Sequence, residues 1–156
     1  MITLKDKIRE ITGAETDFEV HHIFKEIVTK QTVINEKEEI VDLIFIKRSH
    51  IDDRDTESPV ESPAKIIVAT TYGLIFAEEG FKEITEDYYG YKMKNIYYDK
   101  ISSAELDICM LQGEFKVVAN SSKEPEINIS FNTAIYYEEF EKIFEIIRKK
   151  RIEFTQ

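Results

Sequence analysis

The acidic stretch SHIDDRDTESPVESPAK (residues 49–65) holds the densest group of potential metal ligands in the chain. Three of its carboxylates alternate like the first ligands of a calcium-binding loop: Asp53, Asp55 and Glu57. Counted from Asp53, however, the sixth residue is Ser58 instead of Gly and the twelfth is Ala64 instead of Glu. This pattern excludes an EF-hand. A looser cation site and a solvated loop with two X-Pro bonds both remain open, and the composition favours the loop.

The histidines lack the spacing of a metal site. His21 and His22 are adjacent on a predicted helix, whereas two ligands on one helix need a spacing of three or four residues. His50 and Asp52 form a two-ligand fragment, and we identify no third ligand beside them. We therefore predict no metal ion and no cofactor.

The sequence also lacks the motifs that carry catalysis. It contains no GxSxG, P-loop, GxGxxG or HExxH pattern. Glu105 and Asp107 fall on the predicted water-facing side of one strand, where charged residues are ordinary. Cys109 has no partner for an internal disulfide, and its neighbours Ile108 and Met110 indicate a buried small hydrophobe instead of a reactive thiol. We predict no catalytic residue.

Composition and charge narrow the class of protein further. The chain has 156 residues, 42% of them hydrophobic, which favours one globular domain. Its net charge of −10 repels nucleic acids and anionic lipid surfaces, so neither is an expected partner. The charged N-terminus lacks the apolar core of a signal peptide, and no apolar run approaches the ~20 residues that cross a bilayer. We expect a cytoplasmic protein.

The first half of the chain predicts two helices followed by strands. Residues 1–31 carry apolar residues at helical spacing, and Gly13 interrupts the pattern. Thr16 and Glu19 stand at capping-box spacing ahead of the second helix. Apolar runs then predict a first strand covered on both faces and a hairpin behind it: 40–46, 65–70 and 73–79.

The second half predicts half-buried antiparallel strands and a closing helix. Alternating apolar residues mark the strands: 101–110, 115–119 and 127–131. LQGE (111–114) is the predicted turn between the first two, with Gly113 available for a positive φ. Asn132 or Thr133 caps the final helix, whose basic end is Arg148–Arg151. Its predicted buried stripe is Tyr136, Phe140, Ile143, Phe144 and Ile147.

The order of these motifs resembles a known family. KIIVATTYGLIFAEEG is similar to the "ATNRRLIF"-type hairpin of bacterial pleckstrin-homology-like domains, the YokE-like group in particular. IYYDKISSAEL (96–106) is similar to the family's "I-x-Y-x-x-I-S-x-(V/A)" strand entry, and EKEEIVDLI (36–44) to its first strand. Gly113 and the terminal helix also fall at matching positions. The resemblance covers residues 36–150, but the family's bases between "AT" and "LIF" are replaced by Thr71, Tyr72 and Gly73.

The resemblance implies an α+β fold. It predicts a partly open barrel of roughly seven antiparallel strands, closed by the C-terminal helix. We divide the chain into an N-terminal helical extension (1–34) and a pleckstrin-homology-like domain (35–156). The open strand edges of such a barrel must be covered, and the N-terminal helices are candidates for covering one.

The function that eukaryotic pleckstrin-homology domains suggest does not fit the residues. Phosphoinositide binding there uses bases around the loop that joins the first two strands, which corresponds to residues 49–65 here. That loop carries five acids and two bases, so its charge has the wrong sign. Related bacterial domains are thought to form homo-oligomers. We therefore predict a non-catalytic module that acts through protein–protein contacts or self-association. The competing hypothesis is an enzyme or small-ligand receptor that uses the open end of the barrel.

Five residues are candidates for an interaction surface. Four are aromatic side chains in or beside the tyrosine-rich segment 80–95, and the fifth lies off the buried stripe of the final helix: Phe81, Tyr88, Tyr89, Tyr91 and Ile146. The alternative, that the aromatic side chains pack down over the barrel, remains open.

Overall fold

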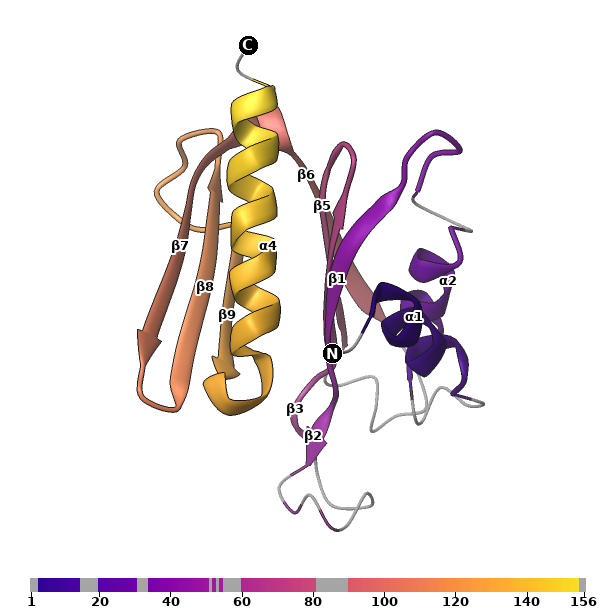
Figure 1. Cartoon of the computed structure of the whole chain (residues 1–156). Coiled ribbons are helices and arrows are strands. Elements are labelled where there is room, and N and C mark those ends of the chain that lie inside the picture. The colour runs from indigo at the N-terminus through magenta and orange to yellow at the C-terminus, as the bar shows by residue number, and fades with distance from the viewer. Residues whose placement is uncertain are drawn as a thin grey trace.

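The chain folds into two antiparallel sheets with a long helix between them (Figure 1). The computed structural model describes residues 3–14, 20–30, 34–50, 52, 54, 60–80 and 90–154. The larger sheet has the strand order β1-β4-β5-β6, formed by β1 (Ile40–Ile46), β4 (Lys65–Thr70), β5 (Gly73–Glu79) and β6 (Tyr91–Tyr97). The smaller sheet has the order β7-β8-β9, formed by β7 (Ile101–Cys109), β8 (Gln112–Ala119) and β9 (Ile127–Asn132). A 3₁₀ turn, η1 (Tyr98–Lys100), joins the two sheets.

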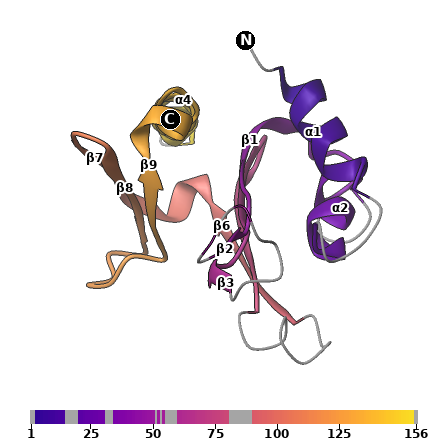
Figure 2. The same cartoon turned by 90° about the horizontal axis from the view of Figure 1, so that it is seen from below.

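The final helix, α4 (Thr133–Glu153), occupies the space between the sheets (Figure 2). Its cap is Asn132, whose side-chain oxygen accepts a hydrogen bond from the Ala134 N–H at 2.9 Å, as the sequence predicts. At the other end, the Arg151 side chain donates to the Ile101 carbonyl at 2.7 Å. The helix is therefore fixed at both ends to the strands that flank it.

The main core lies where the inner faces of both sheets meet α4. Phe115 and Val117 of β8 are buried there, together with Ile127 and Ile129 of β9, in the predicted alternation. The three predicted helix positions that are fully buried are Phe140, Ile143 and Ile147, while Tyr136 and Phe144 are half-buried. The apolar residues at strand spacing and those at helix spacing are thus buried in the same core.

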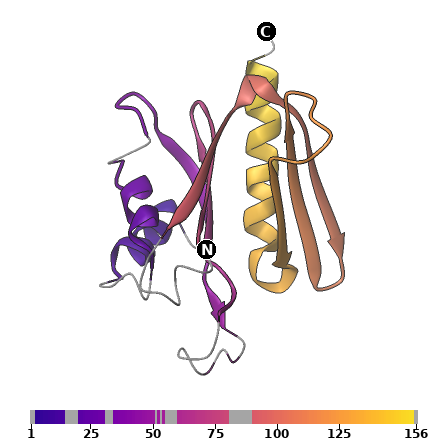
Figure 3. The same ribbon diagram turned by 180° about the vertical axis from the view of Figure 1, so that it is seen from behind.

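A second core lies on the outer face of the larger sheet, under the N-terminal helices α1 (Leu4–Thr12) and α2 (His22–Val28) (Figure 3). Phe24 and Ile27 of α2 pack there against Leu43, Ile66 and Val68 of the sheet. Because β1 and β4 bury side chains on both faces, they read as continuous apolar runs. The helices cover a face of the sheet and not one of its edges.

The two N-terminal helices begin at caps that the sequence analysis did not identify. Thr3 caps α1 through a capping box with Asp6, which also lowers the pKa of the Asp6 carboxyl. Helix α2 begins at His22, with His21 as its cap. The predicted capping pair Thr16 and Glu19 lies outside the described residues.

This arrangement confirms the predicted architecture. The fold is α+β: the described residues form seven principal strands in two sheets, an unclosed barrel, a C-terminal helix and an N-terminal helical extension. One further pair, β2 (Ser49–His50) with β3 (Val60–Ser62), extends beyond the larger sheet. Lys94 of β6 also reaches the chain just before β9, because its side chain donates to the Glu126 carbonyl at 3.0 Å.

The predicted turn at Gly113 is wrong. The β7–β8 turn is formed by Met110 and Leu111, one pair of residues earlier, and Cys109 pairs with Gln112 across it. Gly113 lies inside β8, and none of the described glycines has a positive φ. A Cβ atom on Gly113 would lie 2.6 Å from Cε2 of Phe131, which is its partner on β9. This glycine is required for close approach of a ring and not for a turn.

We predict that Gly113→Ala lowers the free energy of unfolding by about 1–3 kcal/mol, because the new methyl group overlaps the Phe131 ring. Urea denaturation followed by circular dichroism would measure the change. In the double variant with Phe131→Leu, the ring is gone, so the loss should be smaller than the sum of the two single losses. Additive losses would contradict the proposed overlap.

Candidate functional site

The acidic stretch 49–65 is partly organised by the β2–β3 pair. Arg54 and Asp52 are exposed and lie 3.5 Å apart, and the Arg54 N–H also donates to the Asp52 carboxylate at 3.0 Å. The three alternating acids, Asp53, Asp55 and Glu57, lie outside the described residues. Among the residues that are described, no three His, Cys, Asp or Glu side chains cluster as metal ligands.

The two adjacent histidines are held by packing. Nδ1 of His21 accepts a hydrogen bond from the Ile23 N–H at 3.1 Å and so caps α2. The rings of His21 and His22 stack with centroids 4.3 Å apart, and the Tyr91 ring meets His21 edge-on at 5.9 Å. His21 is fully buried. Its contacts give it a structural role at the start of a helix.

The expectation that Cys109 is buried is wrong. The thiol is exposed at the end of β7, beside the turn. Strand alternation explains the result, because Cys109 shares the water-facing side of β7 with Asp107 and Glu105. Met110, which the same alternation was expected to bury, lies beyond the strand and is 90% exposed.

The predicted interaction residues do not form one surface among the described residues. Tyr91 begins β6 and is exposed, with its ring against His21 and His22 at the start of α2, on the outer side of the larger sheet. Ile146 is half-buried against the main core, on the other side of that sheet. Phe81, Tyr88 and Tyr89 lie outside the described residues.

A buried ion pair joins the end of β5 to the chain that follows β1. Arg48 and Glu79 form two hydrogen bonds of 2.8 Å, and their side chains are only 7% and 0% exposed. The Glu79 carboxylate also accepts from the Ala64 N–H at 2.8 Å. These bonds orient the segment that leads into β4. The sequence carries no signal for the pair, because its partners are 31 residues apart.

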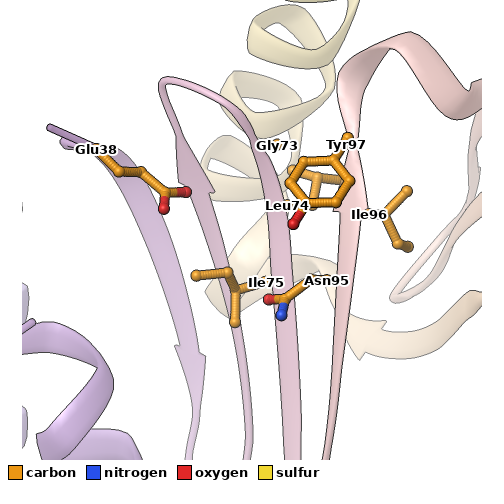
Figure 4. A pocket seen from close by; sticks show the side chains of 7 residues that line it. All are labelled: Glu38, Gly73, Leu74, Ile75, Asn95, Ile96 and Tyr97. Carbon is orange, nitrogen blue, oxygen red and sulfur yellow. The ribbon is translucent and has the colours of Figure 1, made fainter. Parts of the chain in front are cut away.

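A small cavity of about 40 Å³ lies beside the β4–β5 turn (Figure 4). Its lining consists of Glu38, Gly73, Leu74, Ile75, Asn95, Ile96 and Tyr97. The Glu38 carboxylate accepts from the Thr70 hydroxyl and from the Asn35 N–H. Tyr98 donates its hydroxyl proton to the Thr70 carbonyl at 2.6 Å, and burial, with the charge of Glu38, raises the pKa of that phenol. The cavity has room for about one water molecule, and its acid is already committed to the fold.

A larger, open groove of about 430 Å³ lies between α1 and the first turns of α4. Lys7 crosses it and contacts Asp42 at 3.0 Å and Glu139 at 3.2 Å, which ties α1 to β1 and α4. The exposed apolar side chains in its wall are Ile135 and Tyr137. A hydrogen bond to Glu141 raises the pKa of Tyr137.

Exposed apolar side chains gather where this groove meets the β7–β8 turn. The Thr133 N–H donates to the Leu111 carbonyl at 3.0 Å and the Thr133 hydroxyl to the Met110 carbonyl at 2.7 Å, so the turn adjoins the start of α4. Leu111 is 71% exposed and Ile135 is 65% exposed. We call the end of the β7–β8 hairpin and the adjoining start of α4 the hairpin end; its exposed large apolar side chains are Ile108, Met110, Leu111, Ile135 and Tyr137. The sequence analysis did not identify this surface. The pattern that could have indicated it is the pair of apolar residues, Met110 and Leu111, at a turn.

A comparison with solved structures finds one that is similar to this chain. It is the crystal structure of a DUF1696-family protein with a pleckstrin-homology domain from Shewanella loihica PV-4. The likeness has a TM-score of 0.47 at 12% sequence identity and covers 93% of this chain and 96% of that one. No protein-family profile and no curated protein matches the chain.

Within the described part of the chain, no helix combines the length and the apolar composition needed to cross a membrane.

We predict that Glu79→Gln lowers the free energy of unfolding by roughly 3 kcal/mol, because the buried Arg48 then faces a neutral amide. Equilibrium denaturation would measure the loss. The double variant Arg48→Met/Glu79→Gln removes the charge and keeps an acceptor for the Ala64 N–H, so it should recover most of the stability. A double variant as unstable as Glu79→Gln would contradict this explanation.

We predict that Met110→Gly raises the free energy of unfolding by about 0.5–1 kcal/mol. Met110 has a φ of 55°, which a glycine adopts without strain, and its exposed side chain contributes little burial. Thermal and urea denaturation would measure the gain. Met110→Ala, which keeps the Cβ atom, is the matched control and should not gain. A loss of stability in Met110→Gly would show that the methionine side chain packs in the fold.

Proposed function

We propose that the chain is a non-catalytic, YokE-like pleckstrin-homology-like module that acts through protein–protein contacts, self-association included. The observation that carries this proposal is the hairpin end, where the β7–β8 hairpin and the adjoining first turns of α4 together expose five large apolar side chains. Clustered exposed apolar residues at an ordered surface are typical of protein interfaces. The proposal assigns the module to the cytoplasm, where its single thiol stays reduced.

Strand edges support the same proposal. Among the described residues, β6 pairs only with β5, and β7 pairs only with β8. Each therefore presents one edge with backbone groups available to a neighbouring strand. Tyr91 and Tyr97 on β6 are exposed beside such an edge. A module that carries both apolar side chains and open edges has two means of binding protein.

The filled interior argues against the competing function. A small-ligand receptor or enzyme that used the open end of the barrel would need a cavity between the sheets. That space holds the main core, including the stacked rings of Phe131 and Phe140. The two cavities described above are a pocket for about one water molecule and an open surface groove crossed by the ion pairs of Lys7.

Charge argues against phosphoinositide binding. The connection from β1 to β4 occupies the place of the lipid-binding loop in the resembling domains, and its sequence is acidic. The lysine that ends this connection, Lys65, donates to the Ser62 hydroxyl and to the Pro63 carbonyl. Burial lowers its pKa. Clustered phosphates require several free basic donors, and this loop supplies the opposite charge.

The proposal predicts a size distribution that depends on protein concentration. Light scattering and chemical cross-linking over a wide concentration range should detect species larger than one chain. Leu111→Ser, which removes an exposed apolar side chain from the hairpin end, should weaken that association. Val41→Ser, at an exposed apolar position outside the hairpin end, is the matched control. A chain that stays monomeric and captures no protein from a lysate would overturn the proposed function.

A further inference from the structure

The outer edge of β7 is long and unprotected. β7 has nine residues, pairs only with β8 among the described residues and forms the outer margin of the smaller sheet in Figures 1 and 3. Its register with β8 is regular from Ser103 to Cys109. That stretch contains no proline and no lysine, which are the residues that commonly block an edge strand. Every second residue there directs its N–H and C=O groups away from β8.

The other edge strands of the two sheets each carry some protection. β1 has a bulge near its start, and its Leu43 carbonyl accepts a hydrogen bond from Lys7 at 2.8 Å. The Leu43 N–H donates to the Asp42 side chain at 2.8 Å. β6 carries two lysines, Lys92 and Lys94, and β9 has only six residues and continues directly into α4. Among the described strands, β7 therefore offers the longest edge without such devices.

The inner face of β7 is apolar and only partly covered. Ala104 and Leu106 are half-buried and pack against the main core. Ile108, the next residue on this face, is 43% exposed. A strand added beside β7 would bring its own apolar side chains against these residues and remove more of their surface from water.

The outer face of β7 is polar and acidic. Its side chains are all exposed: Ser103, Glu105, Asp107 and Cys109. Across the pairs of β7 and β8 on this face, one base is set against three acids. Lys116 lies 3.9 Å from Glu105 and 3.5 Å from Glu114. Glu114 is also the direct cross-strand partner of Asp107, so two like charges stand opposite each other.

The charges around this face do not cancel the surplus of acid. On β9, the residues that pair with the same part of β8 are neutral: Asn128, Ser130 and Asn132. Ahead of β7, Asp99 and Lys100 are both exposed and offset each other. Helix α4 exposes both signs of charge, with Glu141 and Arg148 as examples. The edge of β7 thus keeps Glu105 and Asp107 as a local negative charge.

We propose that the edge of β7 binds an extended segment of a partner protein in which basic and apolar residues alternate. This inference rests on the proposed function and names the class of partner. The segment pairs with residues 103–109 and adds a fourth strand to the three-stranded sheet. Its basic side chains lie beside Glu105 and Asp107 on the outer face. Its apolar side chains lie beside Ala104, Leu106 and Ile108 on the inner face.

A second copy of the chain does not fit this edge. If two β7 edges paired in antiparallel fashion with full overlap, Glu105 and Asp107 of one copy would face the same acids of the other. Like charges directly opposite each other on neighbouring strands are destabilising. An acidic segment would meet the same repulsion. The two acids therefore select a basic partner and oppose pairing between identical edges.

The experiment uses the whole chain and a synthetic peptide of about eight residues in which lysine and valine alternate. Fluorescence anisotropy of the labelled peptide would measure its affinity. Amide hydrogen exchange followed by NMR would locate it, because the N–H groups of residues 103–109 that point away from β8 should exchange more slowly in the complex. A peptide of the same composition, with its lysines and valines in two blocks, controls for general attraction to a chain with net charge −10. It should bind at least about tenfold more weakly.

A charge reversal tests the two acids directly. Glu105→Lys/Asp107→Lys should bind the lysine–valine peptide at least about tenfold more weakly and should gain affinity for a glutamate–valine peptide. Glu36→Lys/Glu124→Lys makes the same change in net charge at exposed acids outside β7 and should bind like the native chain. Circular dichroism would verify folding. If the reversed variant does not fold, Glu105→Gln/Asp107→Asn replaces it and should also lose affinity for the lysine–valine peptide.

Several outcomes would overturn this assignment. They are a native chain that does not bind the alternating peptide, equal binding of the alternating and block peptides, and binding that survives the loss of both acids. A bound peptide that leaves the exchange of residues 103–109 unchanged would also contradict it. The hairpin end is tested separately by Leu111→Ser. Association that this variant weakens, in a chain that binds no peptide, would refute the β7 edge and leave the proposed function standing.

Discussion

The flat contact between Phe131 and Phe140 holds α4 against the smaller sheet, and much of the fold depends on it. The rings stack with centroids 4.0 Å apart and an interplanar angle of 13°. Gly113 makes the contact possible, because any side chain there would displace the Phe131 ring. If α4 moved outward, the inner face of the larger sheet would lose its cover as well. Because Gly113 has no Cβ atom, α4 can pack closely enough to cover the inner faces of both sheets.

The N-terminal helices α1 and α2 cover the outer face of the larger sheet. Their apolar stripes bury the outer side chains of β1, β4 and β5, while Lys7 reaches both Asp42 and Glu139. The lysine therefore links the helical extension to the sheet and to α4. The three side chains are only 10%, 16% and 26% exposed, so these part-buried ion pairs fix the start of α4 relative to α1 and β1. The larger sheet therefore contributes one face to the core under the N-terminal helices and the other face to the main core around α4.

The sequence patterns that predict the fold correctly are those repeated over many residues. The two-sided burial of residues 40–46 and the helical stripe through Phe140 and Ile147 each follow from several apolar positions. Single residues were less predictable. Gly113 was assigned to a turn because glycine favours turns, but ring packing decided its position. The Arg48–Glu79 pair joins residues far apart in sequence, so no local pattern could reveal it. The candidate site shares this difficulty, because its residues come from a turn and a helix that only the fold brings together.

The turn at Met110 is where local preference and observed structure conflict most sharply. A positive φ favours glycine, and an exposed turn favours polar residues, yet this position holds a methionine followed by a leucine. Neither side chain is buried enough to stabilise the folded monomer. Sequences usually depart from local preference where binding or another function requires it. Residues that disfavour the isolated fold but would be buried in a contact are the ones expected at an interface. By this argument the unfavourable turn at Met110 supports the proposal that the hairpin end binds a partner.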